Sequence, residues 1–350
     1  MKIIADENIP AVRDAFGTLG DVVTVNGRTL RADDLDDAEI LLVRSVTRVD
    51  ERLLAGSAVR FVASATAGVN HVDLDYLRRA GIAFANAPGS NAVSAAEYVI
   101  AAICYWSLRV DRPLAGLSVG IIGRGNVGSR VQQRCEALGM RCVPNDPPLA
   151  DAGVAGLASI DEALACDIVT LHVPLVEGGA HPTRELIDAA RVDQLRPGTL
   201  FINAARGDVL TEKALRDRLE QRDDLAVVLD VWENEPDIDP EMLRRNLLGT
   251  AHIAGYSADG KIRGTEMIYR ACCDFLGRRP RWSSADVEFS VPRKAVTLTT
   301  GRDVRQDVLD AYDIETDSER LKAILDADVT GIGQYFDYLR KHYPVRREFS

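Results

Sequence analysis

Three charged or titratable residues stand where apolar runs end in the second half of the chain. Arg206 follows "FINAA", Glu235 lies in "LDVWENEP" and His252 lies in "TAHIAGYS". In an open α/β sheet the carboxyl ends of the strands face the ligand crevice, so we expect these distant residues to converge. A guanidinium is costly to bury without a partner, which indicates that Arg206 holds an anion.

Each of the three also has an ordinary structural interpretation when it is taken alone. A histidine after a short apolar run is commonly a satisfied core residue, and an arginine or glutamate at a strand end is commonly a solvated loop charge. Their joint occurrence behind a glycine-rich turn favours the catalytic interpretation.

That turn lies in "SVGIIGRGNVGSRV", where the glycines have G-x-G-x-x-G spacing between an apolar strand and a helix. Glycines there permit a tight turn and a close approach of the backbone to a pyrophosphate at the helix N-terminus. A plain strand-to-helix turn is the alternative. The expected cofactor contacts in the turn are Gly123, Gly125, Asn126, Val127 and Gly128.

Asp146 follows the next apolar strand, 18 positions after Gly128 (146 minus 128). A carboxylate at this place can bond both ribose hydroxyls and would repel a 2′-phosphate, so NAD is predicted in preference to NADP. The alternative for Asp146 is a turn residue in "NDPP", and Pro144 interrupts the strand before it.

Composition excludes several classes of function. The 350 residues include 42 basic and 53 acidic side chains, a net charge of -11, which has the wrong sign for nucleic-acid or membrane-surface binding. The six cysteines form no C-x-x-C pair and have no zinc-type spacing with histidine, so we expect reduced core thiols and no metal. The start "MKIIADENIP" shows no signal-peptide pattern, and a cytoplasmic protein is expected.

Short apolar runs alternate with helix-sized segments, which indicates two α/β blocks with parallel sheets. We expect a first domain over residues 1–92 with a return helix at about 256–285, a second over 93–255, and a small third unit over 286–350. The stretch "NAVSAAEYVIAAICYWSLR" predicts a long helix, and "EFSVPRKAVTLTTGRDV" predicts a strand or two before the last helices.

The motifs "GRGNVG", "LHVPL", "INAARGDV", "LDVWENEP" and "AHIAGYS" resemble the D-2-hydroxyacid dehydrogenase family over about residues 40 to 275. The segments "ADENIP", "ATAGVNHVD" and "YFDYLRKHYPVRREFS" extend the likeness to essentially the full length, toward a branch that oxidises a phosphorylated hydroxy acid. The resemblance implies a flavodoxin-like substrate domain, a Rossmann NAD domain and a small α+β C-terminal dimerisation domain.

The resemblance also implies roles for particular residues. Arg206 would grip the substrate carboxylate, His252 would exchange the proton of the C2 hydroxyl, and Glu235 would hold the imidazole. Cofactor contacts fall on Val173, Asp230 and Gly255, and substrate contacts fall on Ser45, Thr66 and Tyr256. Val173 stands where the pattern tends to carry threonine, so a hydroxyl contact to the cofactor is absent.

Positive charge for a substrate phosphate must be supplied locally in so acidic a chain. Arg44, beside Ser45 at a strand end, suits a phosphate or carboxylate. Arg346 and Arg347 are further candidates, and a solvated tail is the alternative for both. The apolar face of residues 286–350 predicts a homodimer joined through that segment.

The remaining histidines are expected to be structural. His71 is interpreted as a turn residue, with a cleft position as the weaker alternative, and no carboxylate partner is apparent for His172 or His181. Two rival functions stay open: a dehydrogenase for another D-2-hydroxy acid, and a non-catalytic NAD-sensing scaffold on the same fold.

Overall fold

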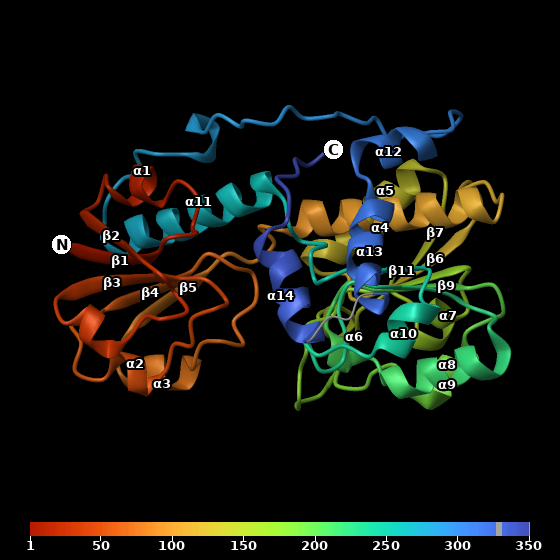
Figure 1. The fold of residues 1–350 in the computed structure, drawn as a ribbon, viewed down its shortest axis with the longest axis horizontal. Coiled ribbons are helices and arrows are strands. Elements are labelled where there is room, and N and C mark those ends of the chain that lie inside the picture. The colour runs from red at the N-terminus through yellow and green to blue at the C-terminus, as the bar shows by residue number, and fades with distance from the viewer. Residues whose placement is uncertain (327–330, 350) are drawn as a thin grey trace. The chain divides into compact units, whose positions relative to one another are not determined.

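The computed structural model describes residues 1–326 and 331–349 and divides the chain into two compact units. Met1–Asn91 and Ser257–Pro292 form the first unit, and Ala92–Tyr256 and Arg293–Ser350 form the second. Each unit has a parallel sheet with helices on both faces, which confirms the two predicted parallel-sheet α/β domains (Figure 1). The predicted C-terminal domain is part of the second unit. In the described part of the chain, no helix has the length and apolarity needed to cross a membrane.

The sheet of the first unit has the order β2-β1-β3-β4-β5. Its strands are β1 (Lys2–Asp6), β2 (Asp21–Val25), β3 (Ala38–Val43), β4 (Phe61–Ser64) and β5 (Ala83–Asn86). Its helices are α1 (Val12–Phe16), η1 (Ala32–Leu35), α2 (Glu51–Leu54), α3 (Leu74–Arg79), α11 (Ala258–Phe275) and η3 (Ser284–Asp286). Strand order reverses between β1 and β3, so the carboxyl ends of these two strands define the ligand crevice of a flavodoxin-like sheet.

Alternation along the buried strands of the first unit gives the sheet two apolar faces. Ile40 and Leu42 pack with α1 and α11, whereas Leu41 and Val43 pack with α2 and α3 (Figure 1). The edge strand β2 was not predicted from the sequence, although "DVVTV" has the β-branched residues typical of a strand.

The sheet of the second unit has the order β11-β10-β9-β8-β6-β7. Its strands are β6 (Ser118–Ile122), β7 (Arg141–Asn145), β8 (Ile168–Leu171), β9 (Leu200–Asn203), β10 (Ala226–Leu229) and β11 (Leu248–Gly249). Pro144 lies within the edge strand β7, where its missing N–H removes no inner ladder bond. Strand order reverses between β6 and β8, directly beside the glycine-rich turn.

Helices cover both faces of this sheet. α4 (Ala92–Arg109), α5 (Asn126–Ala137) and α12 (Arg305–Ala311) pack on one face. The other helices of the unit are α6 (Pro147–Asp151), α7 (Ile160–Leu164), α8 (Ala189–Gln194), η2 (Gly207–Val209), α9 (Glu212–Arg222), α10 (Pro240–Arg245), α13 (Ile314–Lys322), η4 (Ala323–Leu325) and α14 (Ile332–Lys341). Helix α13 reaches both cores, because Ile314 joins the cluster of α4 and Leu321 joins the opposite one. α4 is buried along nearly its whole length, which confirms the predicted long helix. Figure 1 shows α4 and α5 on one face of the sheet and α8 and α9 on the other.

The C-terminal segment packs into both cores of the second unit. Val308 and Phe349 join the cluster of α4, and Leu321 and Phe336 join the cluster on the opposite face. The predicted strand or two was wrong: residues 287–304 are all described, and the structure assigns no strand to them. A backbone hydrogen bond joins this segment to the C-terminal tail, from the Val296 N–H to the Phe349 carbonyl at 3.0 Å.

Candidate active site

The three glycines of the turn after β6 have three different surroundings. Gly123 has φ +93°, and a Cβ there would lie 2.8 Å from the carbonyl carbon of His172. A Cβ on Gly128 would lie 1.9 Å from the Gly123 oxygen, whereas one on Gly125 would meet no atom within 4 Å. Gly123 and Gly128 are therefore packed against neighbouring atoms, whereas the space beside Gly125 is open. This open space lies at the N-terminus of α5, where a pyrophosphate fits.

Asp146 lies directly after β7 and caps α6. Its Oδ1 accepts the Leu149 N–H at 3.1 Å, and its Oδ2 accepts the Arg124 N–H of the glycine turn at 2.7 Å. Asp146 is therefore a turn residue, which was the alternative interpretation, and its carboxylate also contacts the glycine turn. Its remaining lone pairs can accept ribose hydroxyls, and the ribose contact stays a prediction.

Arg206 follows β9 in a turn that is tied down from two sides. Asn203 donates to the Arg206 carbonyl at 3.0 Å and accepts the Ala205 N–H at 3.1 Å. A Cβ on Gly207 would lie 1.9 Å from the Trp232 oxygen, so only glycine lets this turn approach the loop after β10. The packing brings Arg206 next to the loop that carries Glu235.

His252 and Glu235 form a direct pair, with Nδ1 of the imidazole 2.7 Å from Oε2 of the carboxylate. The other oxygen of Glu235 accepts the Trp232 N–H at 2.9 Å. Because Nδ1 bonds the carboxylate, Nε2 is the ring nitrogen left to face a substrate hydroxyl. The trio predicted from the sequence is therefore assembled at one edge of the sheet, although its catalytic roles stay a prediction.

Asp230 fixes the backbone of the histidine loop, which sequence reasoning missed. Its buried carboxylate accepts the N–H groups of Ile253 at 2.7 Å and Ala254 at 3.0 Å and the Thr250 hydroxyl at 2.7 Å. His252 itself has φ 53°, the left-handed region that is strained for a non-glycine residue. The network around Asp230 holds this strained conformation, and its predicted cofactor contact is untested.

The pKa values of the charged residues in the site are shifted in different directions. Burial raises the pKa of Asp230, against the charge of His252 and its own hydrogen bonds. Burial would also raise the pKa of Glu235, but the hydrogen bond and charge of His252, the Trp232 N–H and the charge of Arg340 lower it overall. Burial lowers the pKa of Arg206, against the charge of Glu235.

The guanidinium of Arg206 donates to the carbonyl of Ala205 at 2.6 Å. Within the described ranges it has no carboxylate within ion-pair distance, although the charge of Glu235 acts on it. A half-buried, permanently charged guanidinium with no carboxylate partner among the described residues suits a carboxylate ligand.

In the first unit, Arg44 follows β3 at the switch point of the sheet. Its Nε lies 3.1 Å from Oδ1 of the buried Asp6, at the end of β1. Burial and then the charge of Arg44 lower the pKa of Lys261, which lies in the first turn of α11. Lys261 was not predicted, since nothing in the local sequence links it to Arg44.

The other predicted substrate and cofactor residues have varied surroundings. Ser45 is exposed beside Arg44, and the Thr66 hydroxyl donates to the Gly68 carbonyl at 3.1 Å. Tyr256 packs edge-on against Tyr343, with ring centroids 5.7 Å apart. Val173 lies against the glycine turn, and Gly255 lies in the turn closed by the bond from the Tyr256 N–H to the Ile253 carbonyl.

Arg346 is buried, so the solvated-tail alternative is wrong for this residue. Its guanidinium bonds Glu97 of α4 at 2.9 Å and lies 4.3 Å from the Tyr312 ring centroid. Glu97 also accepts the Phe349 N–H at 2.7 Å. The pair anchors the tail, and a substrate role for Arg346 would require it to open. The substrate role predicted for Arg347 stays untested.

The remaining histidines have structural partners. His71 lies 3.0 Å from the Ser64 hydroxyl, and burial lowers its pKa. Burial lowers the pKa of His172 to about 3, so it is neutral. The absence of a carboxylate partner for His181 was wrong, because its Nε2 lies 2.7 Å from Asp151.

Cysteine chemistry and metal binding find no support in the described residues. All six cysteines are free, as expected, and burial raises the pKa of the Cys104 thiol to about 12. Within residues 1–326 and 331–349, no group of histidine, cysteine and carboxylate side chains could hold a metal ion.

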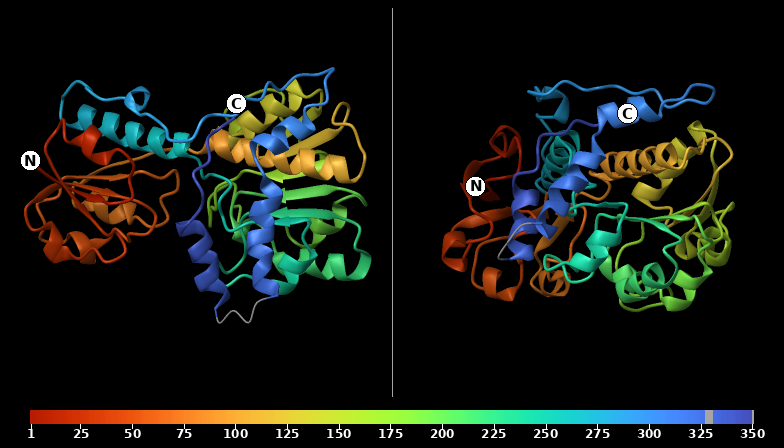
Figure 2. Two further views of the ribbon diagram at one scale, coloured as in Figure 1. Left: turned by 45° about the horizontal axis from the view of Figure 1, so that its top comes forward. Right: turned by 45° about the vertical axis from the view of Figure 1, so that its right-hand side comes forward.

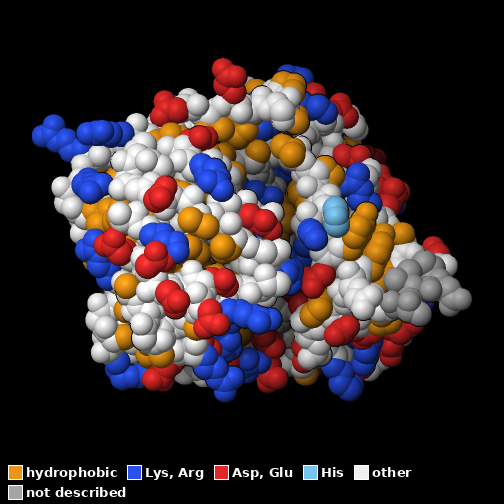
Figure 3. Space-filling model, turned by 60° about the vertical axis from the view of Figure 1, so that its left-hand side comes forward, with side chains coloured by type: hydrophobic (Ala, Val, Ile, Leu, Met, Phe, Trp, Pro, Cys, Tyr) orange, Lys and Arg blue, Asp and Glu red, His pale blue; other side chains and the backbone are white. Residues whose placement is uncertain are grey.

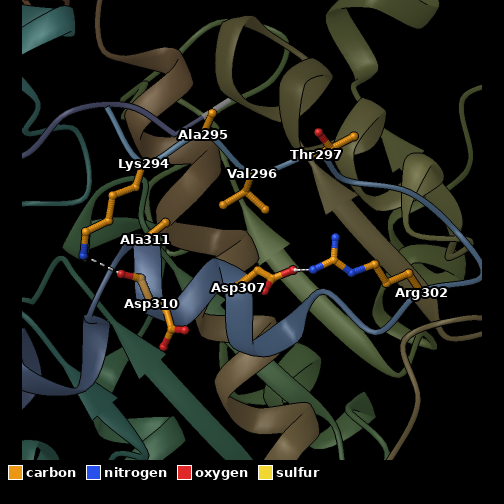
Figure 4. Close-up of a pocket in the computed structure, with 8 residues that line it drawn as sticks. All are labelled: Lys294, Ala295, Val296, Thr297, Arg302, Asp307, Asp310 and Ala311. Carbon is orange, nitrogen blue, oxygen red and sulfur yellow. Dashed lines mark hydrogen bonds and ion pairs between the residues drawn. The ribbon is translucent and has the colours of Figure 1, made fainter. Parts of the chain in front are cut away.

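A surface pocket of about 330 Å³ is lined by residues 294–297, by Arg302 and by α12 (Figure 4). Lys294 donates to the Asp310 carbonyl at 2.8 Å, and Arg302 lies 2.6 Å from Asp307, so both cations at the pocket are already partnered. Figure 3 shows acidic and basic side chains interspersed over the face that it presents. Neither feature indicates a second anionic ligand.

Comparison with known proteins gives this geometry its context. Residues 104–254 match the family model of the D-isomer specific 2-hydroxyacid dehydrogenase NAD-binding domain, and residues 294–350 match a domain of unknown function. An erythronate-4-phosphate dehydrogenase of Hahella chejuensis is 45% identical, covering 100% of this chain and 93% of the relative. The chain belongs to the erythronate-4-phosphate dehydrogenase family.

Other relatives agree with this assignment. A namesake from Klebsiella pneumoniae is 44% identical over 100% of this chain and 93% of its own length. The NAD-bound 3-phosphoglycerate dehydrogenase of Entamoeba histolytica has a TM-score of 0.69 at 25% identity, covering 79% of this chain and 95% of that structure. Erythronate-4-phosphate dehydrogenases are D-2-hydroxyacid dehydrogenases, and this member is an NAD-dependent oxidoreductase.

Proposed function

We propose that this protein oxidises 4-phospho-D-erythronate to 2-oxo-3-hydroxy-4-phosphobutanoate, a step in the biosynthesis of pyridoxal 5′-phosphate. The observation that carries the proposal is the likeness to erythronate-4-phosphate dehydrogenases over the whole chain, C-terminal segment included. The geometry of Arg206, Glu235 and His252 supports the same chemistry.

In this proposal, Nε2 of His252 takes the proton of the C2 hydroxyl while the hydride leaves C2. Glu235 holds the imidazole through Nδ1 and stabilises the imidazolium that forms. Arg206 binds the substrate carboxylate and polarises the C2 oxygen. Gly123, Gly125, Asn126, Val127, Gly128 and Asp146 would hold NAD, which would accept the hydride when it is bound.

The phosphate of the substrate needs cations, and the first unit offers two that act on each other. Arg44 pairs with Asp6 at the switch point of the sheet, and its charge also lowers the pKa of Lys261. A phosphate dianion bound there would meet two cations and one carboxylate. We assign the phosphate to this pair and retain Ser45, Thr66 and Tyr256 as proposed substrate contacts.

The deciding experiment is a turnover assay with 4-phospho-D-erythronate, supplied with NAD and with a 2-oxo acid as a possible terminal oxidant. A panel of glycerate, 3-phosphoglycerate and lactate serves as the comparison. Turnover of the phosphorylated erythronate well above the panel supports the proposal. Preference for another hydroxy acid would establish the first rival function, and NAD binding without any turnover would establish the scaffold.

We also propose a cytoplasmic homodimer joined through residues 286–350. Exposed apolar side chains on this segment, Tyr338 at 54% and Val345 at 59%, support an interface there. Truncating the segment would strip Phe336 and Phe349 from the cores, so the full chain must be used. Light scattering of the full chain should give twice the 38.2 kDa chain mass, and Val345→Asp should lower it.

A further inference from the structure

Helix α14 packs directly against the loop that carries Glu235. A Cβ on Gly333, in the first turn of α14, would lie 2.5 Å from Oδ1 of Asp237 and 3.1 Å from Cγ of Pro236. Phe336, one turn further on, is fully buried in the same cluster as Trp232. The helix and the catalytic loop therefore form one packed body, and Figure 2 shows α14 beside α13 in the same unit.

The far end of α14 lies against the loop that carries His252. A cavity of about 320 Å³ is lined on one side by Ala251 and Ile253, the two neighbours of His252, and on the other by Tyr338 and Leu339. Tyr343, just beyond the helix, packs on Tyr256. Both catalytic loops thus touch the stretch of chain that includes Arg340.

Arg340 is weakly neutralised by its own helix. Its side chain is 27% exposed, and the Asp337 carboxylate lies at the limit of ion pairing, 4.0 Å away. The guanidinium lies 6.0 Å from the Phe336 ring centroid, and its buried Nε has no hydrogen-bond partner among the described residues. A half-buried cation that is only weakly paired exerts its field on the charges around it.

We propose that Arg340 is a positioning residue of the active site, whose guanidinium keeps Glu235 ionised and in place and thereby sets the protonation of His252. This inference rests on the proposed roles of Glu235 and His252. The electrostatics support it: the charge of Arg340 is among the causes that lower the pKa of Glu235, against burial. Burial would lower the pKa of Arg340, but the charges of Tyr256 and Glu235, a hydrogen bond to Tyr256 and the charge of Asp337 raise it overall.

Several other groups act on the same pair. The charged and titratable groups that face Glu235, His252 or Arg340 are Arg206, Asp230, Tyr256 and Asp337, with Asp317 and Arg320 at the adjoining cavity. Among these, Arg340 is a cation on α14, so its removal favours a proton on the pair. Oxidation needs neutral His252, and the acid limb of the activity profile should therefore move to higher pH.

The test measures kcat/KM for 4-phospho-D-erythronate against pH. Arg340→Gln should raise the pKa of the acid limb by roughly half to one pH unit. Arg340→Lys keeps the charge and should restore the limb toward its original position. Lys341→Gln removes a charge of the same sign from the exposed neighbour on α14 and should leave the limb unmoved.

Asp337→Asn is a second test that leaves Arg340 in place. It removes a half-exposed carboxylate beside the guanidinium, so the field on Glu235 strengthens and the limb should move slightly to lower pH. NMR titration of labelled His252 gives the same shifts without turnover, and covers the case in which Arg340→Gln is inactive.

Glu235→Gln separates this inference from the one on which it rests. This substitution should lower the pKa of the acid limb, because a neutral amide no longer stabilises the imidazolium of His252. If Glu235→Gln leaves the limb unchanged, the roles of Glu235 and His252 are wrong. If Glu235→Gln moves the limb but Arg340→Gln and Asp337→Asn do not, or if Lys341→Gln moves it as far as Arg340→Gln, the role of Arg340 is overturned.

Discussion

The glycine turn after β6 and the trio after β9, β10 and β11 lie at the same edge of one sheet but are built in opposite ways. The turn spans six consecutive residues and offers backbone, with open space at Gly125. The trio offers side chains from three separated loops, and each loop needs its own support. A local pattern thus specifies the first site, whereas tertiary packing specifies the second.

The strongest test of this comparison removes the side chains of the trio. His252→Ala and Arg206→Ala should each lower kcat by about a hundredfold or more, because they remove proton transfer and carboxylate binding. NAD affinity, measured by calorimetry, should stay within a few-fold, since neither residue belongs to the turn. His181→Ala is the control and should keep near-parental turnover; a similar loss there would make the effect non-specific.

A matched pair of substitutions can separate the packing role of Gly128 from the binding role of Gly125. Gly128→Ala places a methyl group 1.9 Å from the Gly123 oxygen, so it should lower the free energy of unfolding by about 2 kcal/mol. Gly125→Ala meets only open space, so it should keep its melting temperature while losing about tenfold in NAD affinity. Equal loss of stability in both variants would refute the division between packing and binding glycines.

Asp146 is predicted to set the preference for NAD over NADP. Asp146→Ala should reduce the ratio of NAD to NADP activity by roughly tenfold, because the carboxylate that bonds the diol and repels a 2′-phosphate is gone. Asp151→Ala, on the same short helix, is the control. An unchanged ratio in Asp146→Ala would remove this residue from the ribose site.

The smallest effect concerns a carboxyl that supports the loop of the trio. Burial raises the pKa of Glu212 to about 7 from 4.5, while its Oε2 accepts the Glu233 N–H at 3.0 Å. The folded state therefore holds a proton that the unfolded state has lost, and stability falls as the pH rises from about 4.5 to 7.

Glu212→Gln keeps an acceptor for the Glu233 N–H and removes the loss of stability between pH 4.5 and 7. Denaturant unfolding should show the variant more stable than the parent by about 1 kcal/mol at pH 8, with no gain at pH 4.5. A gain that does not depend on pH would show that titration of Glu212 is not its cause.

The sequence predicted local patterns and the residues at the ends of parallel strands, and it missed contacts between helices and loops that lie far apart in the chain. The βαβ alternation, α4 and the three glycines follow from patterns within a few residues of one another. The ends of strands also brought Arg206, Glu235 and His252 to one edge. Nothing near Arg340 reveals that α14 meets the Glu235 loop, because the two are far apart in the chain.

The failed predictions have the same origin. "VTLTT" has the propensity of a strand but finds no neighbouring strand to pair with among the described residues. For Arg346 the sequence offered only a substrate contact or a solvated tail charge, because its partner, Glu97, lies 249 positions away in the chain on the buried side of a helix.

Both units are assembled from two stretches of chain, and this interleaving constrains how the protein is made. During synthesis the sheet of residues 1–91 emerges long before α11, which supplies Ile262, Ile268 and Tyr269 to its core. The first sheet therefore emerges from the ribosome with this face covered only in part, by α1, until residues 92–256 and then α11 have been translated. Hybrids with relatives that exchange residues 1–91 alone would inherit a mismatched core, so both stretches have to be exchanged together.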